Sequence, residues 1–190
     1  MDDNLRSRAR AHIKHGEGSI NHMYMDTVGK VTVGVGNMLP NIGAASELPF
    51  ILEDSRKLAS QEDIINDFEN VSKQKSGMRA QKYHDFTKLV LTEEYIDILL
   101  DKRIDEFERQ LNKDFSNYKE CPAAVQLGLL DMAFNLGNSG LVKKFPTFCK
   151  AVKAENWEVC AVECNRRGIS DERNAETCAL FRECVVDTHD

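Results

Sequence analysis

The chain has 190 residues, 42% of them hydrophobic and 29% charged, and a formal net charge of −6. This length suits one compact domain or two closely packed lobes, and the acidic charge argues against an electrostatic nucleic-acid binder. No apolar run approaches the ~20 residues of a membrane-spanning helix. The polar N-terminus, from Met1 to Asn4, does not resemble a secretory signal, so we expect neither stable membrane insertion nor a classical signal peptide.

The first part of the chain predicts a short helix followed by a β-hairpin. Apolar residues at helical spacing predict a helix over residues 4–15, which Gly16 and Gly18 are expected to end. Over residues 31–36, valines then alternate with threonine and glycine, and this two-residue period is typical of a strand. The hairpin is predicted to have strands over residues 23–25 and 30–35 and a turn over residues 26–29.

The middle of the chain predicts mostly helix. Residues 38–60 contain two prolines and are expected to be irregular, whereas residues 60–72 predict a polar helix that begins with a capping serine. Residues 79–90 are a further helix candidate. The clearest helix covers residues 92–113, because the good N-cap Thr92 precedes apolar residues spaced by three and four.

The last third of the chain predicts a helical lobe. Residues 123–136 are apolar nearly all round, so they are expected to form the buried central helix of this lobe, between Pro122 and Gly137. Further helices are expected from Pro146, over residues 155–165 and from Ser170 or Asp171. The predicted fold class is therefore α+β.

All the cysteines lie in this last third. Their even number and common location indicate local cross-linking in an oxidising compartment, although six cysteines allow fifteen pairings. Buried free thiols are the alternative, since cysteine packs as a small hydrophobic residue. No pair has CxxC spacing, so zinc is not predicted. The six are Cys121, Cys149, Cys160, Cys164, Cys178 and Cys184.

Two carboxylates flank the start of the predicted hairpin. Glu17 follows the first helix, Asp26 lies in the turn nine residues later, and Thr32 lies on the returning strand. Glycoside hydrolysis needs one carboxyl group that donates a proton to the leaving oxygen and a second that activates water. A helix end facing a hairpin can hold such a pair, with the glycines beside Glu17 leaving room for substrate.

Other residues occupy fixed positions around this pair. Glu17-Gly18 is followed, after a short gap, by Tyr24-x-Asp26-x-x-Gly29-x-x-Thr32-x-Gly34-x-Gly36. This pattern resembles the active-site signature of the phage-type lysozymes, the family 24 glycoside hydrolases. The likeness extends to the buried helix that contains Asp131 and ends at Gly137, and to a late helix with the pattern Arg173-x-x-Glu176.

The resemblance implies a lysozyme-like fold and a muramidase. Glu17 would be the general acid, Asp26 would activate the attacking water and Thr32 would position it, while Asn135 and Arg173 would bind substrate. Such an enzyme would cleave the β-1,4 bond between N-acetylmuramic acid and N-acetylglucosamine in peptidoglycan, without a cofactor or metal. Because the family generally inverts configuration, the two carboxyl groups are expected about 6.5–9.5 Å apart.

The resemblance also implies an arrangement of the chain. It predicts one lysozyme-like domain over residues 1–190, composed of a hairpin lobe over 16–91, a connecting helix over 92–113 and a helical lobe over 114–190. The first helix, over residues 4–15, is expected to pack on the helical lobe.

Two features depart from the compact phage enzymes. Asn37 stands where the family commonly has histidine, which we expect to affect stability rather than activity. Residues 37–91 form a longer segment, similar to that of the pesticin-like muramidases used as bacteriocins and interbacterial toxins. An effector or bacteriocin domain, or an endolysin, is therefore expected. It would be a monomer made in the cytoplasm and delivered to the periplasm and cell wall of a bacterium, where an immunity protein is a further candidate partner.

Three alternatives remain open. The chain could be an inactive module that binds peptidoglycan, although retention of Glu17, Asp26 and Thr32 argues against this. It could also act on chitin-type polymers. Finally, His12, His15 and His22 lie close in sequence, so a metal site is an alternative to their ordinary roles in packing.

Overall fold

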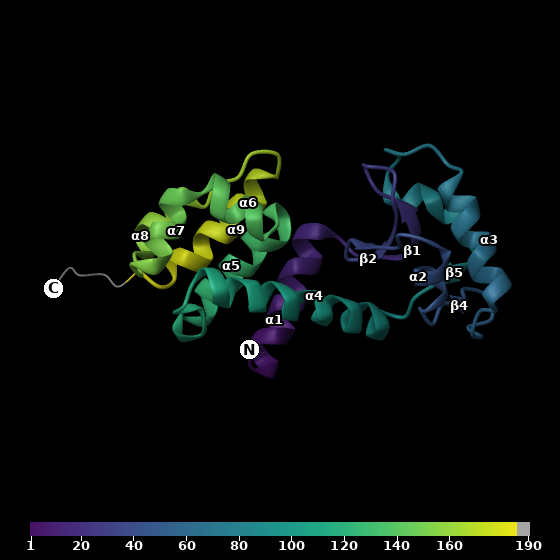
Figure 1. The fold of residues 1–190 in the computed structure, drawn as a ribbon, viewed down its shortest axis with the longest axis horizontal. Coiled ribbons are helices and arrows are strands. Elements are labelled where there is room, and N and C mark those ends of the chain that lie inside the picture. The colour runs from purple at the N-terminus through teal and green to yellow at the C-terminus, as the bar shows by residue number, and fades with distance from the viewer. Residues whose placement is uncertain (186–190) are drawn as a thin grey trace. The chain divides into compact units, whose positions relative to one another are not determined.

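The computed structural model describes residues 1–185, and of Asn138 its backbone only. The protein is a mixed helical and antiparallel β structure, which confirms the α+β class. Contacts divide the chain into two compact units, shown in Figure 1. We call residues 17–102 the hairpin unit, and residues 1–16 together with 103–190 the helical unit. The predicted helical lobe extends over residues 186–190, which lie outside the described residues.

The predicted β-hairpin is present in the hairpin unit. Strand β1 (Ile20–Met25) pairs antiparallel with β2 (Val31–Gly34), which pairs in turn with the short β3 (Asn37–Met38). The first strand starts three residues earlier than predicted, and its register with β2 shifts between Ile20 and Tyr24. Beyond this irregularity, Tyr24 lies opposite Thr32, so these two positions of the sequence pattern are paired across the strands.

The remainder of the hairpin unit contains more regular structure than predicted. Residues 38–60 were expected to be irregular but include a short helix and a strand. The predicted helix over 60–72 is confirmed, and Ser60 caps it by accepting a hydrogen bond from the Asp63 amide. The elements are α2 (Ile42–Ser46), β4 (Ile51–Leu52), α3 (Gln61–Ser72), the 3₁₀ helix η1 (Ala80–Phe86) and β5 (Leu89–Val90).

The prediction of one helix over residues 79–90 is wrong. The segment is a 3₁₀ helix followed by strand β5, which pairs with β4. The buried carboxylate of Asp67 on α3 accepts hydrogen bonds from the amides of Lys88 and Leu89, at 2.8 and 2.9 Å. These amides would bond within a continuing helix, so their capture by Asp67 favours the extended conformation.

The helical unit contains the predicted C-terminal helices and one more, α6. Figure 1 shows α5 and α9 passing through it, with α7 and α8 beside them. Ser170 caps α9, as expected, by accepting a hydrogen bond from the Arg173 amide. The elements after residue 114 are η2 (Tyr118–Glu120), α5 (Ala123–Leu136), α6 (Asn138–Lys144), α7 (Pro146–Lys153), α8 (Trp157–Glu163) and α9 (Asp171–Arg182).

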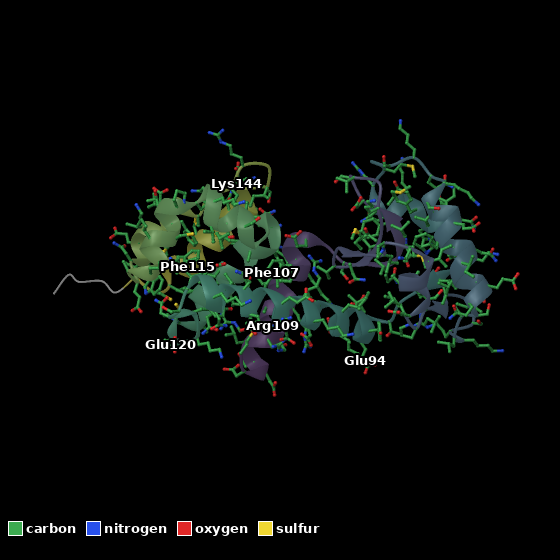
Figure 2. All side chains as sticks on the ribbon, viewed as in Figure 1. Glu94, Phe107, Arg109, Phe115, Glu120 and Lys144 are labelled. Atoms are coloured by element: carbon green, nitrogen blue, oxygen red, sulfur yellow. The ribbon has the colours of Figure 1, made fainter. Side chains whose placement is uncertain are left out.

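Helix α5 is the core of the helical unit, as its composition predicted. Every residue from Ala124 to Phe134 is buried. Gly128 allows the closest packing, because a Cβ atom at this position would lie 2.7 Å from the ring of Phe181 on α9. The ring of Phe134 packs at 4.4 Å between centroids against Phe107, which Figure 2 labels on α4.

The predicted long helix is α4 (Glu93–Asp114), and the boundary between the two units lies within it, after Lys102. Its N-cap is Thr92, whose hydroxyl oxygen accepts a hydrogen bond from the Tyr95 amide at 3.2 Å. Helix α1 (Asp3–Glu17) packs Leu5, Ala9 and Ile13 into the core. Within residues 1–185, no helix is both long and apolar enough to cross a bilayer.

Candidate active site

Glu17 is the last residue of α1, so the expectation that Gly16 ends this helix is wrong. The chain leaves the helix at Gly18, whose φ of 79° is in the left-handed region that favours glycine. Strand β1 begins at Ile20, only three positions after Glu17. The Glu17 side chain is exposed, so it is accessible to a polymeric substrate.

Asp26 organises the hairpin turn through one of its two carboxylate oxygens. Its Oδ1 accepts hydrogen bonds from the backbone amides of Val28 and Lys30, at 2.9 and 2.8 Å. Gly29 has a φ of 79°, which completes the tight turn. Because both bonds use Oδ1, the orientation of the half-exposed carboxylate is fixed while Oδ2 is left to accept a hydrogen bond from water.

Thr32 is anchored to the same turn. Its hydroxyl donates a hydrogen bond to the backbone carbonyl of Lys30 at 3.1 Å, and the residue is only 2% exposed. The amide of Lys30 binds Asp26 and its carbonyl binds Thr32, so the structure brings these two predicted site residues together around one backbone segment. The remaining lone pairs of the Thr32 hydroxyl can still accept a hydrogen bond.

Arg173 belongs to a buried ion-pair cluster in the helical unit. Its Nε and Nη2 donate to Asp131 Oδ1 at 3.1 and 2.7 Å, and its Nη1 donates to the carbonyl of Gly16 at 3.0 Å. The other carboxylate oxygen of Asp131 accepts from Arg166 at 2.6 Å and from the Thr177 hydroxyl at 2.7 Å. Two arginines therefore share one fully buried carboxylate.

The electrostatics of this cluster favour an ionised Asp131. Burial alone raises the pKa of the Asp131 carboxyl, but the Arg166 and Arg173 guanidinium groups and the Thr177 hydroxyl outweigh it, so the pKa lies below its ordinary value. His12 lies beside the cluster, with its Nε2 3.8 Å from Asp131. Burial lowers the pKa of His12 despite this carboxylate.

Gly16 has a role that the sequence did not indicate. We expected the glycines beside Glu17 to leave room for substrate, but at Gly16 a Cβ atom would lie 2.7 Å from Arg173 Nε. The space is therefore taken by the guanidinium group of Arg173. This arginine fixes the backbone immediately before Glu17, and it is 8% exposed. Its predicted role in binding substrate remains a prediction.

Asn135 lies near the end of α5, in its last turn, and is half-buried. Its role in binding substrate also remains a prediction. Sequence reasoning missed Arg166 and Thr177 as partners of Asp131. Arg166 lies in the loop before α9, where no periodicity marks it, and only the spacing of Arg173 and Thr177 by one helical turn could have indicated a shared partner.

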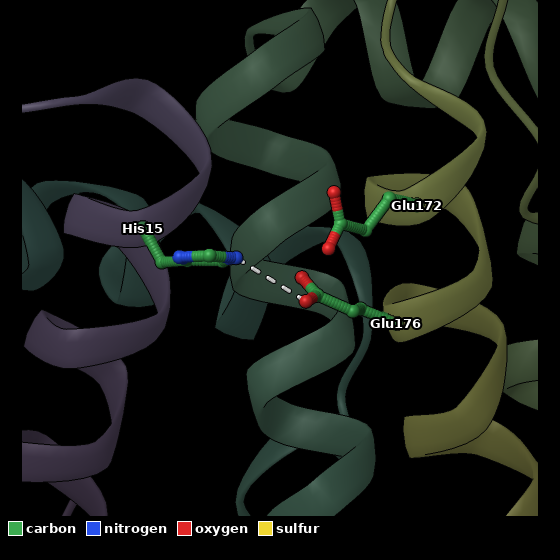
Figure 3. A group of neighbouring side chains, drawn as sticks. All are labelled: His15, Glu172 and Glu176. Atoms are coloured by element: carbon green, nitrogen blue, oxygen red, sulfur yellow. Dashed lines mark ion pairs between the residues drawn. The ribbon is translucent and has the colours of Figure 1, made fainter.

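The three neighbouring histidines have different partners in the structure. His15 faces Glu172 and Glu176 on α9, as Figure 3 shows, with its Nε2 3.3 Å from Glu176. The three side chains offer ligand atoms within 4.8 Å of one another, but His15 and Glu172 are exposed. His12 contacts Asp131 instead, and His22 lies in the hairpin unit with its Nδ1 2.9 Å from the Met23 carbonyl. Within this exposed cluster, His15 pairs with Glu176.

A scan of the chain against protein-family models finds no matching model, and a search of curated proteins finds no match. The resemblance to phage-type lysozymes therefore remains an expectation from the sequence pattern.

Proposed function

We propose that the protein is a lysozyme-like muramidase that hydrolyses the β-1,4 bond between N-acetylmuramic acid and N-acetylglucosamine in peptidoglycan. Glu17 and Asp26 are the catalytic carboxylates, and Thr32 positions the attacking water. The enzyme needs no cofactor for this reaction. Its compartment of action is the bacterial cell wall, where it serves as an effector, bacteriocin or endolysin domain.

The observation that carries this proposal is the arrangement of Asp26 and Thr32 around the backbone of Lys30. Both residues hold this segment, Asp26 through its amide and Thr32 through its carbonyl. A carboxylate fixed by two backbone amides, with a second oxygen available for water, suits a general base. Glu17 lies nine positions earlier in the same compact unit and is exposed to solvent, so a sugar can reach its carboxyl group.

The reaction follows from these roles. Glu17 donates its proton to the glycosidic oxygen as the bond to the anomeric carbon breaks. A water molecule held by Asp26 Oδ2 attacks that carbon from the opposite face and transfers its proton to Asp26. The product sugar carries the new hydroxyl in inverted configuration. This order of events distinguishes the proposal from a retaining mechanism, in which the second carboxylate would bond covalently to the sugar.

The test is incubation of the protein with purified sacculi, followed by turbidity, mass spectrometry of soluble fragments and determination of the first anomer by NMR. We expect fragments with muramic acid at the reducing end and inverted configuration. Binding to sacculi without soluble fragments would indicate the non-catalytic module, and release of fragments only from chitin oligomers would indicate a different substrate. Retained configuration would exclude the proposed role of Asp26.

Replacing Asp26 by asparagine separates catalysis from folding. We expect Asp26→Asn to lower the rate of sacculus lysis by about 10²–10⁴-fold, the usual contribution of a general base. The hairpin should persist, because the asparagine oxygen can accept the same two amide hydrogen bonds that hold Asp26 Oδ1. Lysis rate and thermal unfolding of the purified variant check both expectations.

The matched control is Asp54→Asn. Asp54 is an exposed turn aspartate in the same unit, and it also accepts a backbone amide hydrogen bond. Its replacement removes the same charge and should leave lysis unchanged. Near-wild-type lysis by Asp26→Asn would show that Asp26 serves only the turn.

A further inference from the structure

Two of the six cysteines have their thiols in contact. Cys164 is the C-cap residue of α8 and Cys178 lies in the middle of α9. Their Sγ atoms are 3.0 Å apart, and the residues are 0% and 5% exposed. Since a disulfide bond is about 2.05 Å long, the sulfur atoms need to approach by only about 1 Å to form one.

Three of the other four thiols contact backbone carbonyls. Those of Cys121, Cys149 and Cys184 point to backbone carbonyls, of Asn117, Leu141 and Leu180 respectively. The sequence alone left fifteen pairings open. The geometry favours one bond, between Cys164 and Cys178.

The surroundings hold the two thiols in place. Arg166, two positions after Cys164, donates to the hydroxyl of Thr177, the neighbour of Cys178, at 2.6 Å. Asn174 and Arg166 exchange two hydrogen bonds of 2.9 Å between α9 and the loop before it. These contacts fix both ends of the loop, so closure by a disulfide requires little rearrangement of the folded chain.

We propose that Cys164 and Cys178 form a disulfide when the protein enters an oxidising compartment and are free thiols where it is made. The proposal is independent of the muramidase activity proposed above. The disulfide would close a loop of about 15 residues, for which the chain-entropy account predicts substantial stabilisation. It would connect α8 and α9 beside the residues that hold Asp131.

The oxidant is an external disulfide, such as oxidised glutathione. The Cys178 thiolate attacks one of its sulfurs, which forms a mixed disulfide and releases the first thiolate. The Cys164 thiolate then attacks the Cys178 sulfur, which forms the internal bond and releases the second thiolate. Two electrons and the two cysteine protons pass to the external disulfide, which becomes two thiols. Burial raises the pKa of the Cys164 thiol, so we expect exchange during folding or local opening.

The experiment refolds the full chain in glutathione buffers of oxidising and reducing ratio, blocks free thiols with an alkylating reagent and maps the protein by mass spectrometry. We expect four blocked thiols after oxidising refolding and six after reducing refolding. Trypsin alone leaves Cys160 and Cys164 on one peptide, so cleavage after Glu163 is added to separate them. The oxidised form should unfold about 5–10 °C higher than the reduced form.

The variants distinguish this bond from general effects of oxidation. Cys178→Ser should abolish the difference in melting temperature between the two forms, whereas Cys149→Ser, a buried thiol that contacts a carbonyl, should retain it. Mapping of the wild-type chain decides the question even if Cys178→Ser fails to fold. Six free thiols at the oxidising ratio, or a bond between any other two cysteines, would overturn the proposal.

Discussion

Glu17→Gln is expected to abolish lysis of sacculi, with a loss of at least about 10³-fold in rate, while the protein remains folded. Glutamine has nearly the same shape as glutamic acid but has no proton of suitable acidity for a leaving sugar oxygen. Glu17 is the exposed last residue of α1. A negative charge there opposes the helix dipole, so its removal should leave the melting temperature unchanged or slightly higher. A lysis assay and a thermal unfolding curve measure the two effects.

A matched variant is Glu47→Gln. Glu47 is also an exposed glutamate at the C-terminal end of a helix, the C-cap of α2, and it lies in the same compact unit. It should retain full lysis and show a similar small change in melting temperature. If Glu17→Gln lysed sacculi as fast as Glu47→Gln, Glu17 would not be the acid and the proposed mechanism would fail.

Local features of the fold could be predicted because the residues that determine them are close in sequence. Ser60, Thr92 and Ser170 each begin a helix as expected, because a side-chain oxygen at the N-cap binds an amide only two or three positions later. The turn at Asp26 follows from the same kind of local bond. The apolar character of α5 also predicted its burial, since no face of this helix is polar.

Features that depend on distant residues could not be predicted in this way. The error at residues 79–90 comes from Asp67, which lies more than twenty positions before the amides that it captures. The role of Gly16 depends on Arg173, which lies 157 positions away. Arg173 itself was identified through a family pattern, but nothing in that pattern indicates that two arginines and a threonine share the carboxylate of Asp131.

For the candidate site, the sequence predicts the residues and the structure adds how some of them are held. The carboxylate of Asp26 and the hydroxyl of Thr32 were expected to cooperate, and both bind the backbone of Lys30. The two bonds span only four and two positions, so this shared anchor follows from local sequence, as the turn itself does.

Asp131→Asn is expected to destabilise the helical unit by about 3–5 kcal/mol, because the buried guanidinium groups of Arg166 and Arg173 lose the carboxylate that they share. Asp131 is fully buried, and Arg166 and Arg173 are 3% and 8% exposed. The measurement is urea unfolding followed by the fluorescence of Trp157, the only tryptophan of the chain, which lies in this unit. Asp131→Asn should unfold at a much lower urea concentration than the wild type.

The matched control is Asp105→Asn, which removes one partner of Arg6 at the same distance of 2.7 Å, but from a side chain that is 55% exposed. An exposed pair contributes less than about 1 kcal/mol, so this variant should unfold close to the wild type. Equal urea midpoints for the two variants would show that the buried ion pairs of Asp131 contribute no more to stability than an exposed pair does.

The stability difference between the wild type and Asp131→Asn should depend on pH, and this dependence tests whether the charge of Asp131 is responsible. Because the pKa of Asp131 lies below its ordinary value in the folded protein, its ionised form contributes stability that is complete above the pKa of an unfolded aspartate, about 3.9. That contribution is lost as the pH falls from there through the lowered pKa. Asparagine has no charge to lose, so the difference in free energy of unfolding between the wild type and Asp131→Asn should become smaller below about pH 4. A gap that stays constant from pH 7 to pH 3 would mean that the variant fails through packing, and that the ion pairs of Asp131 are not what holds α5, α9 and the loop before α9 together.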